Sequence, residues 1–457
     1  MLKKNHAYIR ISSLILAKKR YADVLIFITT VLVAFYEVGY SRAENSVPTD
    51  NHTIDKSPMM NAHSEMDPSR HSSMQLPSGV ISLDAVEHQG IIDLLLAKNK
   101  SGLITLWKQT SKDGGKTWLS NNEIKFLNEK GATVTRGSDA RLAIIGDRTV
   151  AMWMSHVDGA KHGGAGPLVA VSSDNEGKTW SSIQGPSDWA PGPHAFFSLS
   201  SNANTIHAVW LDSRNGPSPA PGSQGLRYAY SLDAGNSWSK NITLDDISCA
   251  CCWTTSKLDR HGNLYVLYRD KQPSDMSIGV VNAETHQWTK LSTVGAFGWD
   301  FAGCPHIGGG LAIHESKRGQ ELHAVIGTRK KEEAGFYYLK SIDGGKSWAD
   351  PVRLGDKTAS HGDIAIDSNG HLAAVWDMIN NDEGDGSLGI YISETHDGIN
   401  WTSPSRISSH HVSASHPRII ANRSGYLVLW TEKSEGKDQV LASKLIYIHK
   451  KYGAVAQ

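Results

Sequence analysis

The sequence predicts an all-β fold, a β-propeller of six or seven blades, and three observations lead to this prediction. Between residues 79 and 450, apolar and polar residues alternate with a period of two, and helical periodicity is nearly absent. A long unit recurs along the chain at intervals of 53 to 57 residues. A short turn motif ending in Trp recurs with it. Such a period is typical of a four-stranded propeller blade.

The first 43 residues are predicted to be an export signal that takes no part in the fold. Basic residues crowd positions 3–20, an apolar run of 15 residues follows at 22–36, and a small-x-small pattern ends at Ala43. The run is short for a bilayer span, which needs about 20 residues. A signal peptide is therefore the first interpretation, and an uncleaved N-terminal anchor is the alternative. Both interpretations export the rest of the chain, to the periplasm or out of the cell.

The charge balance excludes a protein dedicated to nucleic acid. The whole chain has 46 Lys and Arg against 46 Asp and Glu. Without residues 1–43 the balance becomes 39 basic against 44 acidic residues, a net charge of −5. A mildly acidic exported protein has no electrostatic reason to bind DNA or an anionic membrane. We therefore expect no nucleic-acid partner, and membrane contact only through an uncleaved segment at 22–36.

Residues 44–78 are predicted to form a disordered polar linker that is unusually rich in Met and His. Thioether and imidazole groups suit Cu(I) and Cu(II), so one interpretation is a tail that captures copper. The alternative is a low-complexity linker that happens to use these residues. The residues concerned are His52, Met59, Met60, His63, Met66, His71 and Met74.

The turn motif reads Ser-x-Asp-x-Gly-x-Thr/Ser-Trp. Its Asp is expected to accept hydrogen bonds from backbone amides across a tight turn, and its Gly to adopt a positive φ. The Trp is expected to fold back as an apolar plug between strands. These Asp residues therefore serve folding, and we exclude them from the candidate site. The copies are 111–118 (SKDGGKTW), 231–238 (SLDAGNSW) and 341–348 (SIDGGKSW), with looser copies at 172–180 (SSDNEGKTW) and 395–401 (THDGINW).

The long units define the predicted blades. Each begins at a polar residue or Cys and continues into an alternating apolar strand. A seventh, partial unit at 80–109 forms its own blade or closes the ring with the C-terminal strand at 441–448. The blade number therefore stays at six or seven. The six clear units begin at Asp139, His194, Cys251, Cys304, His361 and His416.

Over residues 80–450, the turn copies resemble the Asp-box, or BNR repeat, of the sialidase-like propellers. The resemblance implies a propeller at 79–457 with its ligand site at the mouth of the central channel. The leading function it implies is directed at glycans, as a glycoside hydrolase of the exo-α-sialidase type or as a binder of an anionic sugar. Sialidases also use three Arg, an Arg-Ile-Pro element, an acidic acid/base and a Tyr nucleophile, and this propeller contains no Arg-Ile-Pro. The segments at 249–252 (CACC) and 303–305 (GCP) are similar to a subgroup of BNR-repeat proteins.

Every long unit begins with residues whose side chains can bind metals, carry charge or transfer protons, namely Asp, Arg, His or Cys. The innermost strand of each propeller blade faces the axis, so these side chains are expected to converge at the channel mouth. A hydrated pore with polar walls is the alternative to a convergent functional site. The side chains are Asp139, Arg141, His194, Cys251, Cys252, Cys304, His306, His361, Asp363, His416 and Arg418.

In a first chemistry, the mouth binds and cleaves an anionic sugar. Arginines would hold a carboxylate or sulfate with their planar fork, and an Asp would act as general acid/base. Tyr268 is the nearest candidate nucleophile. For Arg269 and Asp270, a structural ion pair between blades is the alternative. The candidates are Arg141, Arg418 and one of Arg214 or Arg269 for the clamp, Asp139, Asp270 or Asp363 for the acid/base, and His194, Arg214, His361 and His416 for further ligand contacts.

In a second chemistry, the mouth holds a metal ion, with copper as the candidate. Histidines recur at blade spacing, and all four cysteines fall in two adjacent units. Two disulfides are the usual expectation in an exported chain, with Cys304 tying the third long unit to the fourth. A thiolate copper site is the rival interpretation. Its predicted ligands are Cys251, Cys252, Cys304 and His306.

In a third chemistry, nothing reacts, and the mouth binds a glycan or serves as a protein-interaction scaffold. Four aromatic residues could provide stacking surfaces, and packing between blades is the alternative for each of them. They are Phe196, Phe197, Trp253 and Trp299. The sequence therefore leaves open whether this chain is an enzyme.

Overall fold

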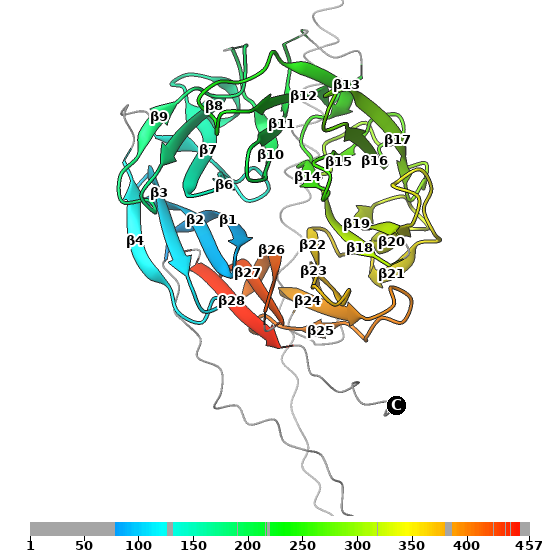
Figure 1. Cartoon of the computed structure of the whole chain (residues 1–457). Helices are drawn as coiled ribbons and strands as arrows, with labels where there is room; N and C mark the ends of the chain where they lie inside the picture. Colours follow the sequence, from blue (N-terminus) through cyan, green and yellow to red (C-terminus); the bar gives the residue numbers. More distant parts are fainter. Residues whose placement is uncertain are drawn as a thin grey trace, which may run out of the picture. The chain divides into compact units, whose positions relative to one another are not determined.

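The computed structural model describes residues 78–447, except 126–130, 190, 215, 217–219, 318, 380–385, 424, 435 and 439. The predicted export segment at 1–43 and residues 44–77 of the linker predicted at 44–78 lie outside the described residues. The described chain forms seven antiparallel sheets arranged as the blades of a β-propeller (Figure 1). The predicted all-β propeller is therefore confirmed, and the number of blades is seven. Among the described residues, no helix is long and apolar enough to cross a bilayer.

The blades follow one another along the chain, and the first strands of each line the centre (Figure 1). Blades 1 to 3 contain β1 (Val80–His88), β2 (Ile91–Lys100), β3 (Leu103–Ser111) and β4 (Leu119–Ile124); β5 (Ala132–Thr133), β6 (Arg141–Ile145), β7 (Arg148–His156), the short α2 (Lys161–Gly164), β8 (Ala165–Ser173) and β9 (Ser181–Ile183); and β10 (Ala195–Ser201), β11 (Ile206–Asp212), β12 (Ser223–Ser231) and β13 (Ile242–Cys249).

The remaining blades repeat the same pattern, and the last has three strands. Blades 4 to 7 contain β14 (Thr255–Leu258), β15 (Leu264–Arg269), β16 (Met276–Val281) and β17 (Trp288–Val294); β18 (Gly309–Ser316), β19 (Gly319–Thr328), β20 (Gly335–Ser341) and β21 (Val352–Gly355); β22 (Gly362–Ile366), β23 (Leu372–Ile379), β24 (Leu388–Thr395) and β25 (Ser405–Arg406); and β26 (Ser413–Asn422), β27 (Gly425–Lys433) and β28 (Val440–Tyr447).

The ring closes between the first and last blades. The partial unit at 80–109 forms a blade of its own, because β4 supplies its fourth strand. Strand β1 contacts β26, and a shared apolar cluster joins Leu83 and Leu94 to Leu427 and Leu429. Ser78 also pairs with Val440 at the outer edge of the three-stranded last blade. The start of the described chain is thus tied to its end.

The hydrophobic core lies between the blades. Apolar clusters fill the space between neighbouring sheets all around the ring, each drawing residues from two adjacent blades. Every residue of β11 is buried, because that strand is covered on both faces. Trp210 and Trp376, at matching positions on the second strands of their blades, are fully buried. Burial on this scale is the main stabilising contribution to the fold.

The repeated turns form as their sequence predicts. Asp113 accepts hydrogen bonds from the backbone N–H and the hydroxyl of Thr117, at 2.9 and 2.6 Å. Gly115 has a φ of 92°. The motif Trp packs against the preceding blade, as the hydrogen bond from Trp238 Nε1 to the carbonyl of Gln184 shows.

One looser copy differs from the prediction by a residue. The turn predicted at 172–180 begins at Ser173, and Asn175 takes the place of the Asp. The Asn175 side-chain oxygen accepts from the N–H of Thr179 at 2.9 Å, as the carboxylate does elsewhere. The spacing therefore matches the regular motif, and no extra residue is inserted.

Candidate functional site

The central channel contains a polar cavity of about 430 Å³. Its walls are the innermost strands β1, β6, β10, β14, β18, β22 and β26, which surround the centre in Figure 1. The charged residues on these walls include Asp84, Arg141, Lys257, Asp363 and Arg418. Cavities of this size suit a small organic ligand.

Two arginines predicted for the ligand clamp do meet in the channel, but they meet on a carboxylate of the protein itself. Arg141 Nη1 lies 3.1 Å and Arg418 Nη2 lies 3.4 Å from Oδ1 of Asp84. Arg418 Nη1 lies 3.2 Å from Oδ2 of Asp363. The two arginines therefore bind the carboxylate of Asp84, where we expected them to bind the carboxylate of a ligand.

The predicted acid/base Asp139 is also engaged. Its Oδ1 accepts from the backbone N–H of Leu83 at 3.0 Å and from Arg136 at 2.6 Å, and its Oδ2 accepts from the N–H of Gly137 at 3.0 Å. Burial alone would raise the pKa of Asp139, but the charges of Arg136 and Arg141 hold it below its usual range. The Asp139 carboxylate is therefore ionised at neutral pH, and it ties the first blade to the second.

Lys257, on β14, adds a cation to the channel wall. Its side chain keeps contact with solvent inside the channel, although protein surrounds it. Burial lowers the pKa of Lys257, and the charge of Asp363 opposes that effect. Among the channel cations described, Lys257 is thus the one most open to a ligand.

Two predicted histidines lie together at the channel mouth, around a buried carboxylate. His361, directly before β22, places Nδ1 2.6 Å from Oδ2 of Asp377 on β23. The backbone N–H groups of His361 and His416 also donate to the Asp377 carboxylate, at 2.9 and 3.1 Å. The two imidazole rings stack with centroids 3.7 Å apart and planes inclined by 16°. One ligand atom from each of the three side chains lies within 4.8 Å of the others.

Burial sets the charge states of this cluster. Burial and the facing His361 imidazole lower the pKa of His416 to about 3. Burial alone would raise the pKa of Asp377, which is fully buried, but His361 holds it below its usual range. At neutral pH His416 is therefore a neutral imidazole next to an ionised carboxylate.

The predicted stacking residue Trp253 covers the two histidines. Its ring centroid lies 5.4 Å from that of His361 and 6.1 Å from that of His416. A Cβ atom on Gly308 would approach the Trp253 ring to 2.2 Å, so only glycine allows the backbone of the 301–308 loop to lie this close. Trp253 directly follows Cys252, so it adjoins the cysteines as well.

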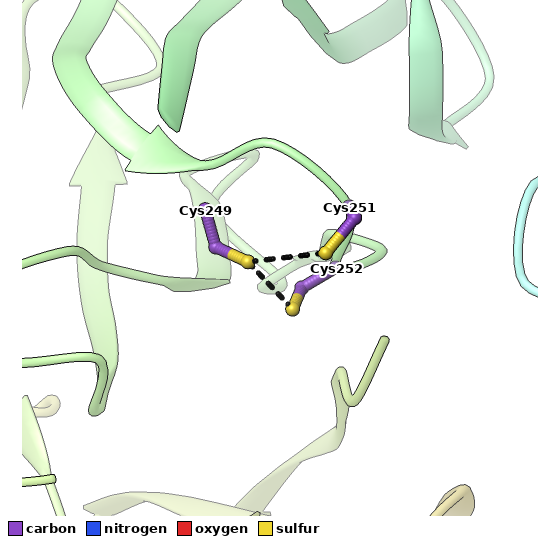
Figure 2. Close-up of side chains that lie close together, drawn as sticks. All are labelled: Cys249, Cys251 and Cys252. Carbon is purple, nitrogen blue, oxygen red and sulfur yellow. Dashed lines mark hydrogen bonds between the residues drawn. The ribbon is translucent and has the colours of Figure 1, made fainter. Parts of the chain in front are cut away.

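Three cysteines converge between blades 3 and 4 (Figure 2). Cys249 ends β13, and Cys251 and Cys252 lie in the turn that leads to β14. Cys249 Sγ lies 2.8 Å from Cys252 Sγ and 3.6 Å from Cys251 Sγ. All three side chains are buried and free, and Phe196 packs against them. Hydrogen bonds from the other two thiols lower the pKa of Cys249.

The predicted metal ligands are brought together only in part. Cys251 and Cys252 meet Cys249, which the predicted ligand set did not include. Cys304 is exposed and free, and His306 is exposed, with its Nδ1 3.0 Å from the carbonyl oxygen of Cys304. The ring of His306 contacts Phe196, so the loop carrying Cys304 lies on the same side as the cysteine cluster.

Other predicted site residues stabilise the blades. Arg269 is buried and donates to three backbone carbonyls, and its guanidinium lies over Trp299. Tyr268 is fully buried and donates to Asp245 at 2.8 Å, while Asp270 pairs with Lys290 at 2.6 Å.

The same holds for three predicted residues of blade 3. Arg214 pairs with Asp212 and Asp188. His194 is fully buried and accepts from the backbone N–H of Leu168, and Phe197 is packed in the core. None of these three lines the channel cavity described above.

Sequence reasoning missed five residues of these clusters. Asp84 and Lys257 lie within inner strands, Asp377 lies within a second strand, and Arg136 precedes the expected unit start. No local pattern marks them, although Arg136 pairs with Asp139 and Asp377 pairs with His361 inside one blade. Cys249 could have been chosen over Cys304, since it stands in the same short segment as Cys251 and Cys252.

No family model and no curated protein matches the chain. Solved structures with a similar arrangement include a protein of unknown function from Dyadobacter fermentans (13% identity, 81% of this chain and 96% of that chain, TM-score 0.47). Others are an α-L-arabinanase from Penicillium chrysogenum (11%, 82% and 98%, TM-score 0.46) and the leech intramolecular trans-sialidase (13%, 82% and 70%, TM-score 0.42). Similarity at this level carries no conclusion about function, which has to come from the residues of this chain.

Proposed function

We propose that this protein is an exported metal-binding propeller that holds a thiophilic ion, Cu(I), at Cys249, Cys251 and Cys252. The observation that carries the proposal is the convergence of three buried sulfur atoms at the side of the channel mouth. Soft thiolates select Cu(I) over hard cations, and burial limits the access of water, which competes as a ligand, and of dissolved oxygen, which oxidises Cu(I). Zn²⁺ fits less well, because structural zinc sites are tetrahedral with four protein ligands.

The position of the cluster supports ion exchange with the surroundings. The turn that carries Cys251 and Cys252 lies between two blades, next to the exposed loop with Cys304 and His306. The predicted Met/His linker would supply further soft ligands on the same chain. The rival state is a disulfide between Cys249 and Cys252, which export would favour.

Cu(I) binding tests this proposal. We expect the purified full chain to bind one Cu(I) at these cysteines in competition with a chromogenic Cu(I) chelator. We expect Cys249→Ser, Cys251→Ser and Cys252→Ser each to weaken that binding at least about tenfold, because each removes one thiolate ligand.

Cys304→Ser is the matched control, because this cysteine is exposed and does not belong to the group of three buried cysteines. It should leave Cu(I) affinity unchanged. A thiol count under denaturing conditions gives the rival outcome. Two missing thiols together with no bound Cu(I) would mean a Cys249–Cys252 disulfide and would overturn the proposal.

A second candidate function is binding or hydrolysis of an anionic glycan in the channel. The observation that favours it is the polar cavity of about 430 Å³ with Lys257 open to solvent on its wall. The channel arginines are already paired with Asp84 and Asp363, so Lys257 would make the main charge contact.

Substitution of Lys257 tests this candidate. We expect Lys257→Met to weaken binding of 3′-sialyllactose about tenfold, the effect of losing one charge-assisted hydrogen bond. Calorimetry measures the affinity, and a fluorogenic sialoside reports hydrolysis. The exposed Lys240→Met is the control. Equal affinity in both variants, or no binding by the natural sequence, would contradict a glycan site here.

A further inference from the structure

A second cluster able to bind a metal contacts the ring of Trp253, the residue that follows Cys252 in the sequence. It consists of His361, Asp377 and His416, contributed by blades 6 and 7. His361 and His416 border a small cavity of about 30 Å³, which Trp253 and Gly137 also line. That volume is enough for a single water molecule or ion.

The hydrogen bond to Asp377 determines which nitrogen of His361 is available. Nδ1 of His361 lies 2.6 Å from the ionised carboxylate and is therefore the protonated nitrogen. The lone pair is then on Nε2. A carboxylate that orients a histidine in this way is the usual outer partner of a metal-binding imidazole.

His416 supplies a second imidazole at the same place. Its ring lies 3.7 Å from that of His361 between centroids, and its Nδ1 lies 3.1 Å from the hydroxyl of Ser415. One ligand atom of each imidazole and a carboxylate oxygen of Asp377 lie within 4.8 Å of one another, so the three side chains offer ligand atoms around one point.

The charges around the cluster permit a cation. Arg136, Arg141 and Arg418 face the same small cavity, but each is paired with a carboxylate, Asp139, Asp84 and Asp363 respectively. Among the described residues, no ion pair joins Asp377 to an Arg or a Lys. Its carboxylate therefore adds one negative charge to the cluster. These pairings keep the three guanidinium groups from excluding a metal by charge alone.

We propose that His361 and His416 bind a divalent transition-metal ion through Nε2, with Asp377 orienting His361. Imidazole ligands suit Cu(II), which forms the most stable complexes among the divalent first-row ions. This site does not depend on the thiolate site. Trp253 adjoins Cys252 through the backbone and contacts both imidazoles through its ring, so both sites would adjoin this one residue.

Cu(II) titration of a full-length Cys249→Ser/Cys251→Ser/Cys252→Ser variant tests the second site without interference from thiolates. We expect electron paramagnetic resonance to show one Cu(II) equivalent with nitrogen coupling that is lost on adding His361→Ala or His416→Ala. Cu(II) ions bound elsewhere in the chain are bound by all these variants alike, so they do not affect the difference between the variants. The control is His306→Ala, which removes an exposed imidazole and should change nothing.

Asp377→Asn separates metal binding from a purely structural role. An Asn amide would donate to Nδ1 of His361 and move the ring proton to Nε2. We therefore expect Cu(II) affinity to fall about 10- to 100-fold while both histidines remain. Circular dichroism should show a folded protein. Unchanged Cu(II) affinity in the folded Asp377→Asn, His361→Ala and His416→Ala variants would overturn the proposal.

A second measurement covers the case in which the triple serine variant does not fold. The natural sequence and His361→Ala are then compared by titration with Zn(II), which thiolates do not reduce. We expect His361→Ala to bind one equivalent less, and equal stoichiometry would count against the site. Loss of Cu(I) binding in the cysteine variants with unchanged Cu(II) or Zn(II) equivalents would show that the two sites are separate.

Discussion

Replacing Arg269 by Met is expected to lower the free energy of unfolding by about 3–5 kcal/mol, the range for breaking a buried charged network. The Arg269 guanidinium is 2% exposed and donates to the carbonyls of Ser274, Ile307 and Gly327 at 2.6, 2.8 and 2.7 Å. Met has a similar length but leaves all three buried carbonyls without their donor. Because these carbonyls belong to two blades, their common interface should weaken.

Denaturant unfolding of the full chain measures this effect. The control is Arg260→Met, since the side chain of Arg260 is 65% exposed and its ion pair with Glu315 lies at the surface. An exposed pair of this kind contributes at most about 1 kcal/mol. A stability change for Arg269→Met no larger than that of the control would contradict the structural role. It would also bring Arg269 back as a candidate ligand contact.

Acidification from pH 7 to pH 4.5 is expected to destabilise the fold by several kcal/mol. Burial lowers the pKa of His194, His207 and His323 to about 4. In the unfolded chain these histidines titrate near pH 6.5. Between the two values the unfolded state binds protons that the folded state does not, so stability is full above about pH 6.5 and is lost as pH falls toward 4. At pH 5, each of these histidines accounts for a loss of about 1–2 kcal/mol in the free energy of unfolding by this linkage.

Single substitutions identify the groups responsible. His207 and His323 occupy equivalent positions, and each Nδ1 lies 2.8 Å from a tyrosine hydroxyl, that of Tyr228 or Tyr338. His207→Gln or His323→Gln should each flatten the dependence of unfolding free energy on pH by about 1–2 kcal/mol over this range. The exposed His261→Gln should leave the slope as it is. If the unsubstituted protein were equally stable at pH 7 and pH 4.5, the proposal that these buried histidines stay neutral in the folded state would be wrong.

The fold could be predicted because its signals are local and repeated. Each turn motif determines its own hydrogen bonds, so Asp113 and Gly115 behave in the structure as their spacing predicts. The blade number could not be predicted, since it depends on whether 80–109 finds a fourth strand and on how Ser78 meets Val440. Both are contacts between distant parts of the chain.

The candidate site was less predictable than the fold. Position at the start of a unit placed Arg141, His361 and Arg418 near the channel, as expected. Position could not show that Arg141 and Arg418 are paired with Asp84, because that residue lies on another blade. Nor could it show that each of the three guanidinium nitrogens of Arg269 donates to a backbone carbonyl.

The sequence by itself determined the class of fold, the turn geometry and the types of side chain that reach the channel mouth, since all three follow from short-range periodicity. Only the tertiary structure decided which of those side chains have partners. Packing of the seventh blade against the sixth brought His416 to His361 and Asp377, and the turn between blades 3 and 4 gathered Cys249 with Cys251 and Cys252. A buried charge or thiol takes its chemistry from the groups that surround it, and in a propeller those groups come from neighbouring blades.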